Sequence, residues 1–231
     1  MIHILAVSDE QTLRGRLPGI DRVDMLISCG DLPPSYTEVL IHRYAPQHRV
    51  MAYGNHDEIF FHDKNPASDS YCRVYKGMYV LDRSICTFTQ KGTQISVGGY
   101  SGAPAYGNSP FFFSDSAVKS YIRKLKIKNF FKDCGIDIMV SHSAPFFEGF
   151  DPNIGSFHQP SASLAEAAEI LKPRLWFYGH IHPRYTPDIL NFYVEKLDMY
   201  LINSIPYVYV LYDPETREVH FKEPEQSIKN I

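Results

Sequence analysis

Five short apolar runs in this chain each end in a cluster of polar residues, and this repeated pattern constrains the fold more than any other feature. The runs are Ile2–Val7, Met25–Ile27, Arg49–Tyr53, Ile136–Val140 and Leu175–Tyr178. The clusters that follow them are Ser8–Gln11, Ser28–Asp31, Gly54–Asp57, Ser141–Ser143 and Gly179–His182. Short apolar runs of this kind are typical of strands buried on both faces. The pattern therefore predicts a sheet with both faces covered.

Helical stretches are predicted between several of these runs. They are Pro34–Tyr44, Ser114–Phe131 with Ser114 as its N-cap, and Ser163–Leu171, which stops before Pro173. Strands that alternate with helices indicate an α/β sheet fold. Because ligands of such folds bind at the carboxyl ends of the strands, we expect all five polar clusters to gather at one edge.

Other segments are rich in β-branched and aromatic residues and predict antiparallel β structure. They are Tyr79–Phe88, Gln94–Gly98, Tyr200–Tyr212 and Glu218–Phe221, with a hairpin turn predicted at Asp213–Arg217. We expect these strands to form a second sheet that packs against the first. The chain shows no internal repeat and no long Pro/Gly/Ser linker, so residues 1–231 are interpreted as one domain.

Composition narrows the function classes. A net charge of -3 is not the signature of a general nucleic-acid binder, and it suits a protein that binds cations through carboxylates. The 4 cysteines contain no CxxC pair, and Cys29 is expected to be a buried thiol, so we predict a cytoplasmic protein without disulfides. The first apolar run lacks a basic leader and is interpreted as a strand, and no run approaches the ~18 residues that span a membrane.

The polar clusters contain the residue types that two divalent cations require. Two such ions repel each other at short range, so a site for both needs an anionic oxygen between them, with imidazole and amide oxygen as further ligands. The candidate ligands are Asp9, Asp31, Asn55, His142, His180 and His182. A chain of 231 residues buries a sufficient core without structural metal, so a metal bound here is expected to be functional.

These motifs, in this order, resemble those of the calcineurin-like metallophosphoesterase superfamily, which run Asp-x-His, Gly-Asp, Gly-Asn-His-Asp/Glu, His and Gly-His-x-His. The resemblance extends from Asp9 to His182. It implies a four-layer αββα sandwich of two mixed β-sheets flanked by helices. It also implies a metal-dependent phosphoesterase, a phosphatase or a phosphodiesterase, in which a hydroxide that bridges two metal ions attacks phosphorus.

The resemblance further implies a role for each ligand. Asp31 is expected to bridge the two metals. Asp9 and His182 are expected to complete the first site, and the second is expected to comprise Asn55, His142 and His180. In the Gly54–Asp57 motif, His56 and Asp57 are assigned to catalysis, with His56 near the leaving group. Mn²⁺ is the favoured ion, with Fe, Zn, Ni or Mg as alternatives.

The chain departs from the family pattern at one position. Gln11 stands where the family has the histidine of its first motif, so a neutral amide oxygen or the neighbouring Glu10 is left to serve the first metal. Two later segments are also predicted to reach the site. Gly98–Phe113 is expected to form a loop over it, and Gly155–His158 to line the substrate pocket. Tyr106 and His158 are the predicted substrate contacts.

Two alternatives stay open on the sequence. A non-catalytic scaffold on the same fold would be expected to have lost ligands, above all His56, which is present. A nuclease would be expected to carry a basic surface. The basic run Lys119–Lys132 is interpreted as a solvated helix face, so a phosphate-ester substrate is favoured over nucleic acid.

Overall fold

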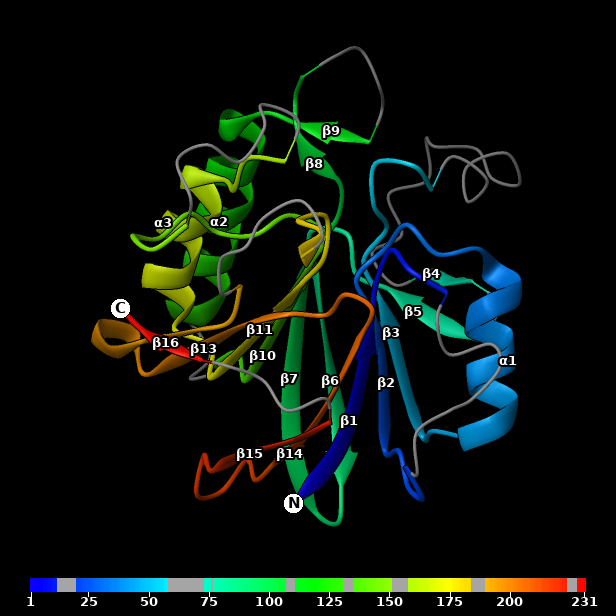
Figure 1. The fold of residues 1–231 in the computed structure, drawn as a ribbon. Coiled ribbons are helices and arrows are strands. Elements are labelled where there is room, and N and C mark those ends of the chain that lie inside the picture. The colour runs from blue at the N-terminus through cyan, green and yellow to red at the C-terminus, as the bar shows by residue number, and fades with distance from the viewer. Residues whose placement is uncertain are drawn as a thin grey trace.

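The computed structural model describes residues 1–11, 20–57, 73–75, 77–106, 111–130, 135–150, 158–183, 190–223 and 228–231. The helices in these ranges are α1 (Pro34–Tyr44), α2 (Asp115–Phe130), α3 (Ala162–Leu171) and the short 3₁₀ helix η4 (Glu195–Leu197). Two large sheets lie face to face between them, with α1 outside one sheet and α2 and α3 outside the other (Figure 1). The predicted four-layer αββα sandwich is confirmed.

Each sheet contains seven strands of mixed direction. The first sheet has the order β15 (Val219–Glu223), β14 (Tyr207–Tyr212), β1 (Ile2–Val7), β2 (Met25–Ser28), β3 (His48–Met51), β5 (Met78–Val80) and β4 (Arg73–Tyr75). The second has the order β16 (Lys229–Asn230), β12 (Phe192–Val194), β13 (Met199–Asn203), β11 (Leu175–Tyr178), β10 (Ile138–Ser141), β7 (Thr93–Tyr100) and β6 (Ser84–Gln90). A small separate pair joins β8 (Ala103–Pro104) to β9 (Phe112–Phe113).

The core explains why the central strands are apolar throughout. In β1, Ile4 and Ala6 pack into the core between the two sheets, whereas Leu5 and Val7 pack into the core under α1. In β11, Phe177 likewise faces the other sheet, and its neighbours along the strand face α2 and α3. Successive side chains of a strand point to opposite faces, so a strand covered on both sides must be apolar at every position.

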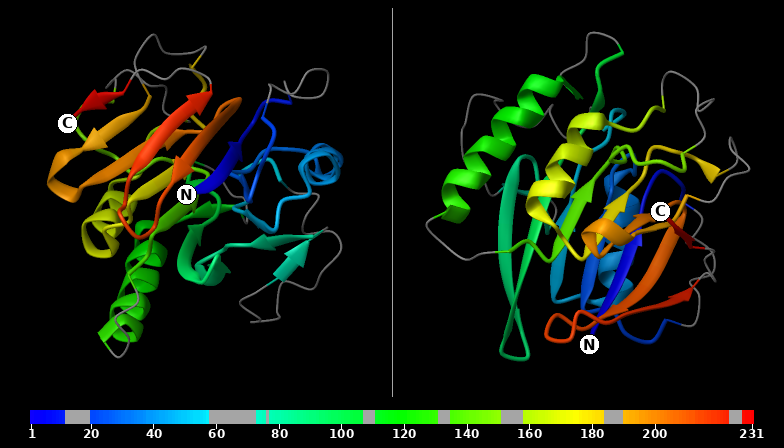
Figure 2. Two further views of the ribbon diagram at one scale, coloured as in Figure 1. Left: turned by 90° about the horizontal axis from the view of Figure 1, so that it is seen from below. Right: turned by 90° about the vertical axis from the view of Figure 1, so that its left-hand side faces the viewer.

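The predicted helices form, with small differences at their starts. Pro34–Tyr44 is confirmed as α1. The second prediction becomes α2, and the Ser114 hydroxyl accepts a hydrogen bond from the Ala117 N–H at 3.3 Å, as expected of an N-cap. The third helix begins one residue earlier than predicted because the Ser161 hydroxyl caps it by accepting from the Leu164 N–H at 3.2 Å. Figure 2 shows α2 and α3 side by side on one face of the molecule.

Two segments predicted to be antiparallel β structure of a second sheet are instead divided between the two sheets. Tyr79–Phe88 contains most of β5 in the first sheet and the beginning of β6 in the second, because the chain turns at Arg83, which has a left-handed φ of 51°. Tyr200–Tyr212 likewise contains β13 in the second sheet and β14 in the first. These strands are separated at Pro206, which has no N–H to donate to a ladder. The hairpin turn after β14 is confirmed, and the Asp213 carboxylate accepts from the N–H groups of the turn.

Two further observations concern predictions made from the sequence. Among the described residues, Cys29 and Cys86 are buried free thiols, as expected for Cys29. No helix in the described ranges is long and apolar enough to cross a membrane.

Candidate metal centre

The strand directions bring the polar clusters to one edge of the sandwich. Strand β1 runs parallel to β2, and β2 runs parallel to β3. In the other sheet, β10 runs parallel to β11. The loops after these strands therefore emerge on the same side of their sheets, as the alternation of strands and helices predicted.

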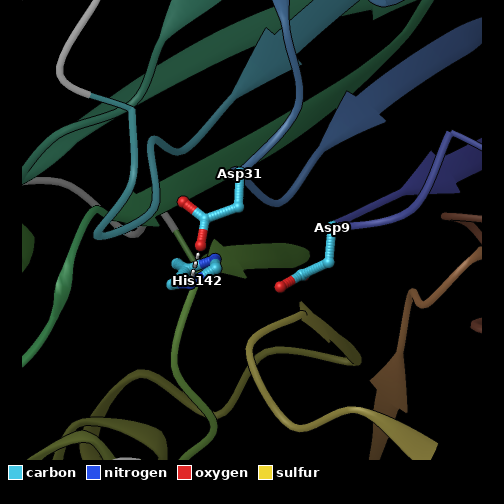
Figure 3. Close-up of side chains that lie close together, drawn as sticks. All are labelled: Asp9, Asp31 and His142. Atoms are coloured by element: carbon cyan, nitrogen blue, oxygen red, sulfur yellow. Dashed lines mark ion pairs between the residues drawn. The ribbon is translucent and has the colours of Figure 1, made fainter.

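Three candidate ligands from two sheets converge at this edge. Asp9 follows β1, Asp31 follows β2 and His142 follows β10. One ligand atom of each lies within 4.8 Å of the other two. Figure 3 shows the Asp31 carboxylate directed at the His142 ring and the Asp9 carboxylate beside the same space. The two sheets thus contribute carboxylates and an imidazole to one shared centre.

His142 is fully buried and its ring orientation is determined by hydrogen bonding. Its Nδ1 lies 2.8 Å from the Cys29 carbonyl oxygen, to which it donates. Its Nε2 lies 2.9 Å from the Asn55 Oδ1 and 3.3 Å from the Asp31 Oδ2. A backbone carbonyl that occupies one ring nitrogen directs the other toward a metal, a common arrangement for ligating histidines. His142, Asn55 and Asp31 are therefore placed to share one cation.

The other histidines predicted at the site are His180, His182 and His158, and their rings lie close to one another. The His180 ring centroid lies 4.8 Å from that of His142 and 5.1 Å from that of His158. His158 also lies 6.2 Å from His182, measured between ring centroids. The rest of the predicted Gly155–His158 segment lies outside the described residues. His158 itself stands beside both histidines of the Gly179–His182 motif.

Tyr106, predicted to contact the substrate, lies beside the candidate ligand Asn55. Its hydroxyl accepts a hydrogen bond of 2.9 Å from the Asn55 Nδ2, so the Asn55 Oδ1 is directed toward His142. The Tyr106 ring lies 4.2 Å from that of Phe112 in β9, measured between centroids. The predicted Gly98–Phe113 loop is wrong at its start, where residues 98–100 continue strand β7. Its other described parts include β8 and β9, and residues 107–110 lie outside the described ranges. Tyr106 therefore has a contact that orients a candidate ligand.

The Gly54–Asp57 motif supplies both a hydrogen-bond donor and a support for the ligand loops. The His56 N–H donates to the Asp31 Oδ1 at 2.8 Å, and the residue is exposed. Asp57 is buried, and its Oδ2 accepts from the Asp31 N–H at 2.9 Å and from the Gly54 N–H at 2.7 Å. Asp57 thus joins the loop that carries Asp31 to the loop that carries Asn55.

Asp9 and His182 form the other side of the centre. The Asp9 Oδ1 lies 3.3 Å from the His182 Nε2. The Asp9 Oδ2 accepts from the Ser8 hydroxyl at 2.5 Å and from the His180 N–H at 3.1 Å. Ser8 was not singled out from the sequence, where a serine beside an aspartate carries no distinguishing signal. These contacts hold one Asp9 oxygen in place and direct the other toward His182.

The backbone is left-handed at three of the candidate ligands. The φ angles of Asp9, Asp31 and His180 are 58°, 54° and 66°. Residues other than glycine rarely adopt this region, and such conformations cluster at functional sites because the surrounding structure must hold them. This geometry lets each strand end turn and present its side chain to the centre.

Two glycines of the motifs are required by close approach. A Cβ on Gly54 would lie 2.1 Å from the Asp31 Oδ1 and 2.7 Å from the His142 Cε1. A Cβ on Gly179 would lie 2.0 Å from the Ser8 Oγ and 2.6 Å from the Asp9 Oδ2. The ligand side chains thus pack directly against bare backbone, which explains why glycine precedes Asn55 and His180.

The electrostatics of the centre suit a cation. Burial by itself raises the pKa of Asp31, but the charge and hydrogen bond of His142 outweigh it and lower that pKa to about 2. Burial and then the charge of His142 lower the pKa of His180 to about 3. The Asp31 carboxylate is therefore ionised and His180 is neutral, the states in which both groups bind metal. Burial followed by the charge of Asp31 raises the pKa of Asp57 to about 7.

The residues present fit divalent metal ions. The pKa of His142 is lowered by burial and raised more strongly by Asp31 and then Asp9, to about 10, so the imidazole holds a proton among oxygen acceptors. A cation at this position would replace that proton and meet imidazole nitrogen, amide oxygen and carboxylate oxygen. This mixed donor set suits first-row divalent ions.

The first motif brings Glu10 rather than Gln11 toward His182. Gln11 is exposed, whereas the Glu10 Oε1 lies 3.5 Å from the His182 Nδ1. Asn203, at the end of β13, was not singled out either. Its Nδ2 donates to the Ile181 carbonyl at 2.8 Å and supports the loop between the two motif histidines. The signal that marked the other clusters, a polar residue at the end of an apolar run, would have identified it.

Comparison with known proteins determines the family. The sequence profile of the calcineurin-like phosphoesterases matches residues 5–184. The chain belongs to this family. Membership of this family supports the interpretation of the chain as a metal-dependent phosphoester hydrolase. The Asp/His centre described above is the candidate site for its divalent cations. A search of curated proteins gave no match.

Solved structures are similar to this calcineurin-like phosphoesterase at low sequence identity. One crystal structure superposes with a TM-score of 0.58 at 14% identity, over 95% of this chain and 98% of the other. The structure of a protein from Thermus thermophilus, TT1561, has a TM-score of 0.53 at 14% identity, over 96% of this chain and 98% of the other. A putative 5'-nucleotidase from Staphylococcus aureus in complex with alpha-ketoglutarate has a TM-score of 0.48 at 13% identity, over 96% of this chain and 52% of the other. At such identities the likeness concerns the fold alone.

Proposed function

We propose that this protein hydrolyses a phosphomonoester or a phosphodiester at a binuclear metal site. The observation that carries the proposal is the convergence of Asp9, Asp31 and His142 from two sheets, with ligand atoms all within 4.8 Å of one another. A purely structural role for the cluster is disfavoured, because burying two carboxylates together costs free energy. A bound cation would offset that cost.

Each candidate ligand has a proposed place. Asp31, which has a ligand atom within 4.8 Å of those of both Asp9 and His142, is the proposed bridging carboxylate. The other ligands divide into a first set, Asp9 and His182, and a second set, Asn55, His142 and His180. Divalent cations held by these residues would supply the Lewis acidity that activates a water molecule and would neutralise the charge that develops on the phosphate. With oxygen and nitrogen donors and no thiolate in the set, Mn²⁺ is the proposed native ion.

The remaining site residues act on the substrate or on the ligands. The exposed His56 side chain is proposed to stabilise or protonate the leaving group, because its backbone N–H is anchored on the Asp31 carboxylate. His158 is proposed to contact the substrate phosphate, since its ring lies beside those of His180 and His182. Asp57 contributes by holding the Asp31 and Gly54 backbones.

The test is hydrolysis of an aryl phosphomonoester and an aryl phosphodiester, each with added Mn²⁺ and with EDTA. We expect turnover that requires metal, and the ratio of the two rates identifies the ester class. Asp31→Asn, which preserves shape but removes the charge, should reduce kcat by at least ~100-fold. The matched control is Glu218→Gln, an exposed residue beside the hairpin turn after β14.

Two results would count against the proposal. Undiminished hydrolysis in Asp31→Asn would exclude this carboxylate from the mechanism. Folded, metal-loaded protein that hydrolyses neither ester would favour the non-catalytic scaffold instead.

A further inference from the structure

The departure from the family pattern at Gln11 raises the question of what serves the first metal position. The chain folds back sharply at the end of β1, where the Glu10 N–H donates to the Ser8 carbonyl at 2.6 Å and Asp9 is left-handed with a φ of 58°. Gln11 is exposed after this turn. The side chain that reaches the centre is that of Glu10, one position earlier than the histidine of the family motif.

Glu10 reaches the centre through His182. The His182 ring lies between two carboxylates, with its Nε2 3.3 Å from the Asp9 Oδ1 and its Nδ1 3.5 Å from the Glu10 Oε1. The side chains of Asp9, His182 and Glu10 are 4%, 16% and 29% exposed, so the contact lies at the rim, where solvent screens it only in part. Each ring nitrogen of His182 therefore lies within 3.5 Å of a carboxylate oxygen, which at the Nδ1 is an ion-pair distance rather than a hydrogen bond.

We propose that Glu10 is a positioning residue that compensates for the imidazole missing at Gln11. A carboxylate on the Nδ1 of a histidine keeps the proton on that nitrogen, directs the Nε2 lone pair at the metal and makes the imidazole a stronger donor. Glu10 also brings a negative charge close to the first metal position, where the family has a neutral ring. This role rests on the proposed binuclear site, and it makes the first position dependent on a residue outside the family's ligand motif.

The experiment is a titration of the metal-free full-length protein with Mn²⁺ by isothermal calorimetry, with metal content measured after equilibrium dialysis. Loss of such an outer carboxylate typically lowers metal affinity by about 10- to 100-fold. We expect Glu10→Gln and Glu10→Ala to lower the affinity for one Mn²⁺ ion by this factor and to leave the affinity for the other ion unchanged. Glu218→Gln is the matched control for removal of a glutamate charge.

Gln11→Ala separates the two candidate residues. If Glu10 has the proposed role, Gln11→Ala binds both ions with wild-type affinity. A loss in Gln11→Ala, with wild-type binding in Glu10→Ala, would assign the role to the Gln11 amide and overturn the proposal. Wild-type affinity for every ion in Glu10→Ala would overturn it as well.

Two readouts distinguish positioning from a general structural effect and from failure of the proposed hydrolysis. A general structural effect would lower the affinity for both Mn²⁺ ions and lower the melting temperature of the metal-free variant. That result would contradict the proposal. Weaker binding of one ion in an otherwise inactive protein would retain the role of Glu10 and refute the hydrolase. Normal hydrolysis with unchanged metal binding in Glu10→Gln would retain the hydrolase and refute the role of Glu10.

Discussion

Replacing Gly54 with alanine tests the geometry of the centre most directly. The added Cβ would lie 2.1 Å from the Asp31 Oδ1 and 2.7 Å from the His142 Cε1. An ordinary van der Waals contact of a Cβ is 3.4–4 Å, so the Asp31 carboxylate or the Gly54 backbone must retreat by more than about 1 Å. Neither moves freely, because the Asp31 Oδ1 accepts from the His56 N–H and the Gly54 N–H donates to Asp57.

The expected cost follows from that displacement. A misplacement of about 1 Å at a catalytic group typically lowers the rate by about 100-fold, and overpacking a buried site costs about 1–3 kcal/mol of stability. We therefore expect Gly54→Ala to bind Mn²⁺ at least ~10-fold more weakly and to lose about 100-fold in kcat/KM. The assays are calorimetric Mn²⁺ titration, aryl phosphate hydrolysis and urea denaturation.

Gly135→Ala is the matched control, because a Cβ at Gly135 meets nothing within 4 Å. It should leave stability within about 0.5 kcal/mol and activity unchanged. If Gly54→Ala instead binds Mn²⁺ with the affinity of the wild-type protein, the reasoning that places Asp31 and His142 as ligands against this backbone is refuted.

Three further predictions concern the surroundings of the centre. Tyr106→Phe removes the hydroxyl that accepts a 2.9 Å hydrogen bond from the Asn55 Nδ2. It should lower the affinity for one Mn²⁺ ion by about 10-fold in a calorimetric titration. Ser141→Ala removes the acceptor of the buried Trp176 indole N–H, at 2.7 Å, and should cost about 1–3 kcal/mol in urea denaturation. Chelation with EDTA should abolish hydrolysis. Mn²⁺ at about 100 times its Kd should raise Tm by about 5–10 °C for each bound ion, from about 2.7 kcal/mol per site.

Each of these predictions has an outcome that contradicts it. Tyr106→Phe with unaltered Mn²⁺ affinity would show that the hydroxyl does not orient Asn55. Ser141→Ala as stable as the control Ser116→Ala, at an exposed position, would mean that the indole N–H finds another partner. A Tm that does not respond to Mn²⁺ would argue that the folded chain does not bind the ion.

Much of the fold and the types of ligand could be read from the chain alone. Runs such as Ile2–Val7 are apolar at every position because both faces of the strand are covered, and that requirement is visible without coordinates. Polar residues that end such runs must lie where strands end. The order of the motifs from Asp9 to His182 predicted the family, which the profile match over residues 5–184 confirms.

Tertiary structure decided what depends on contacts between distant segments. Tyr79–Phe88 and Tyr200–Tyr212 are uniformly β-prone, and local propensity does not tell which part of each joins which sheet.

The same limit applies to the site. The sequence predicted that Gln11 or Glu10 serves the first metal position, but only the backward turn after β1 places the Glu10 carboxylate 3.5 Å from His182. That distance joins residues 172 positions apart in the chain, and a local pattern carries no information about such a pairing. The local sequence therefore determines which ligand types the site contains. The packing of the two sheets determines which of the neighbouring side chains contacts His182.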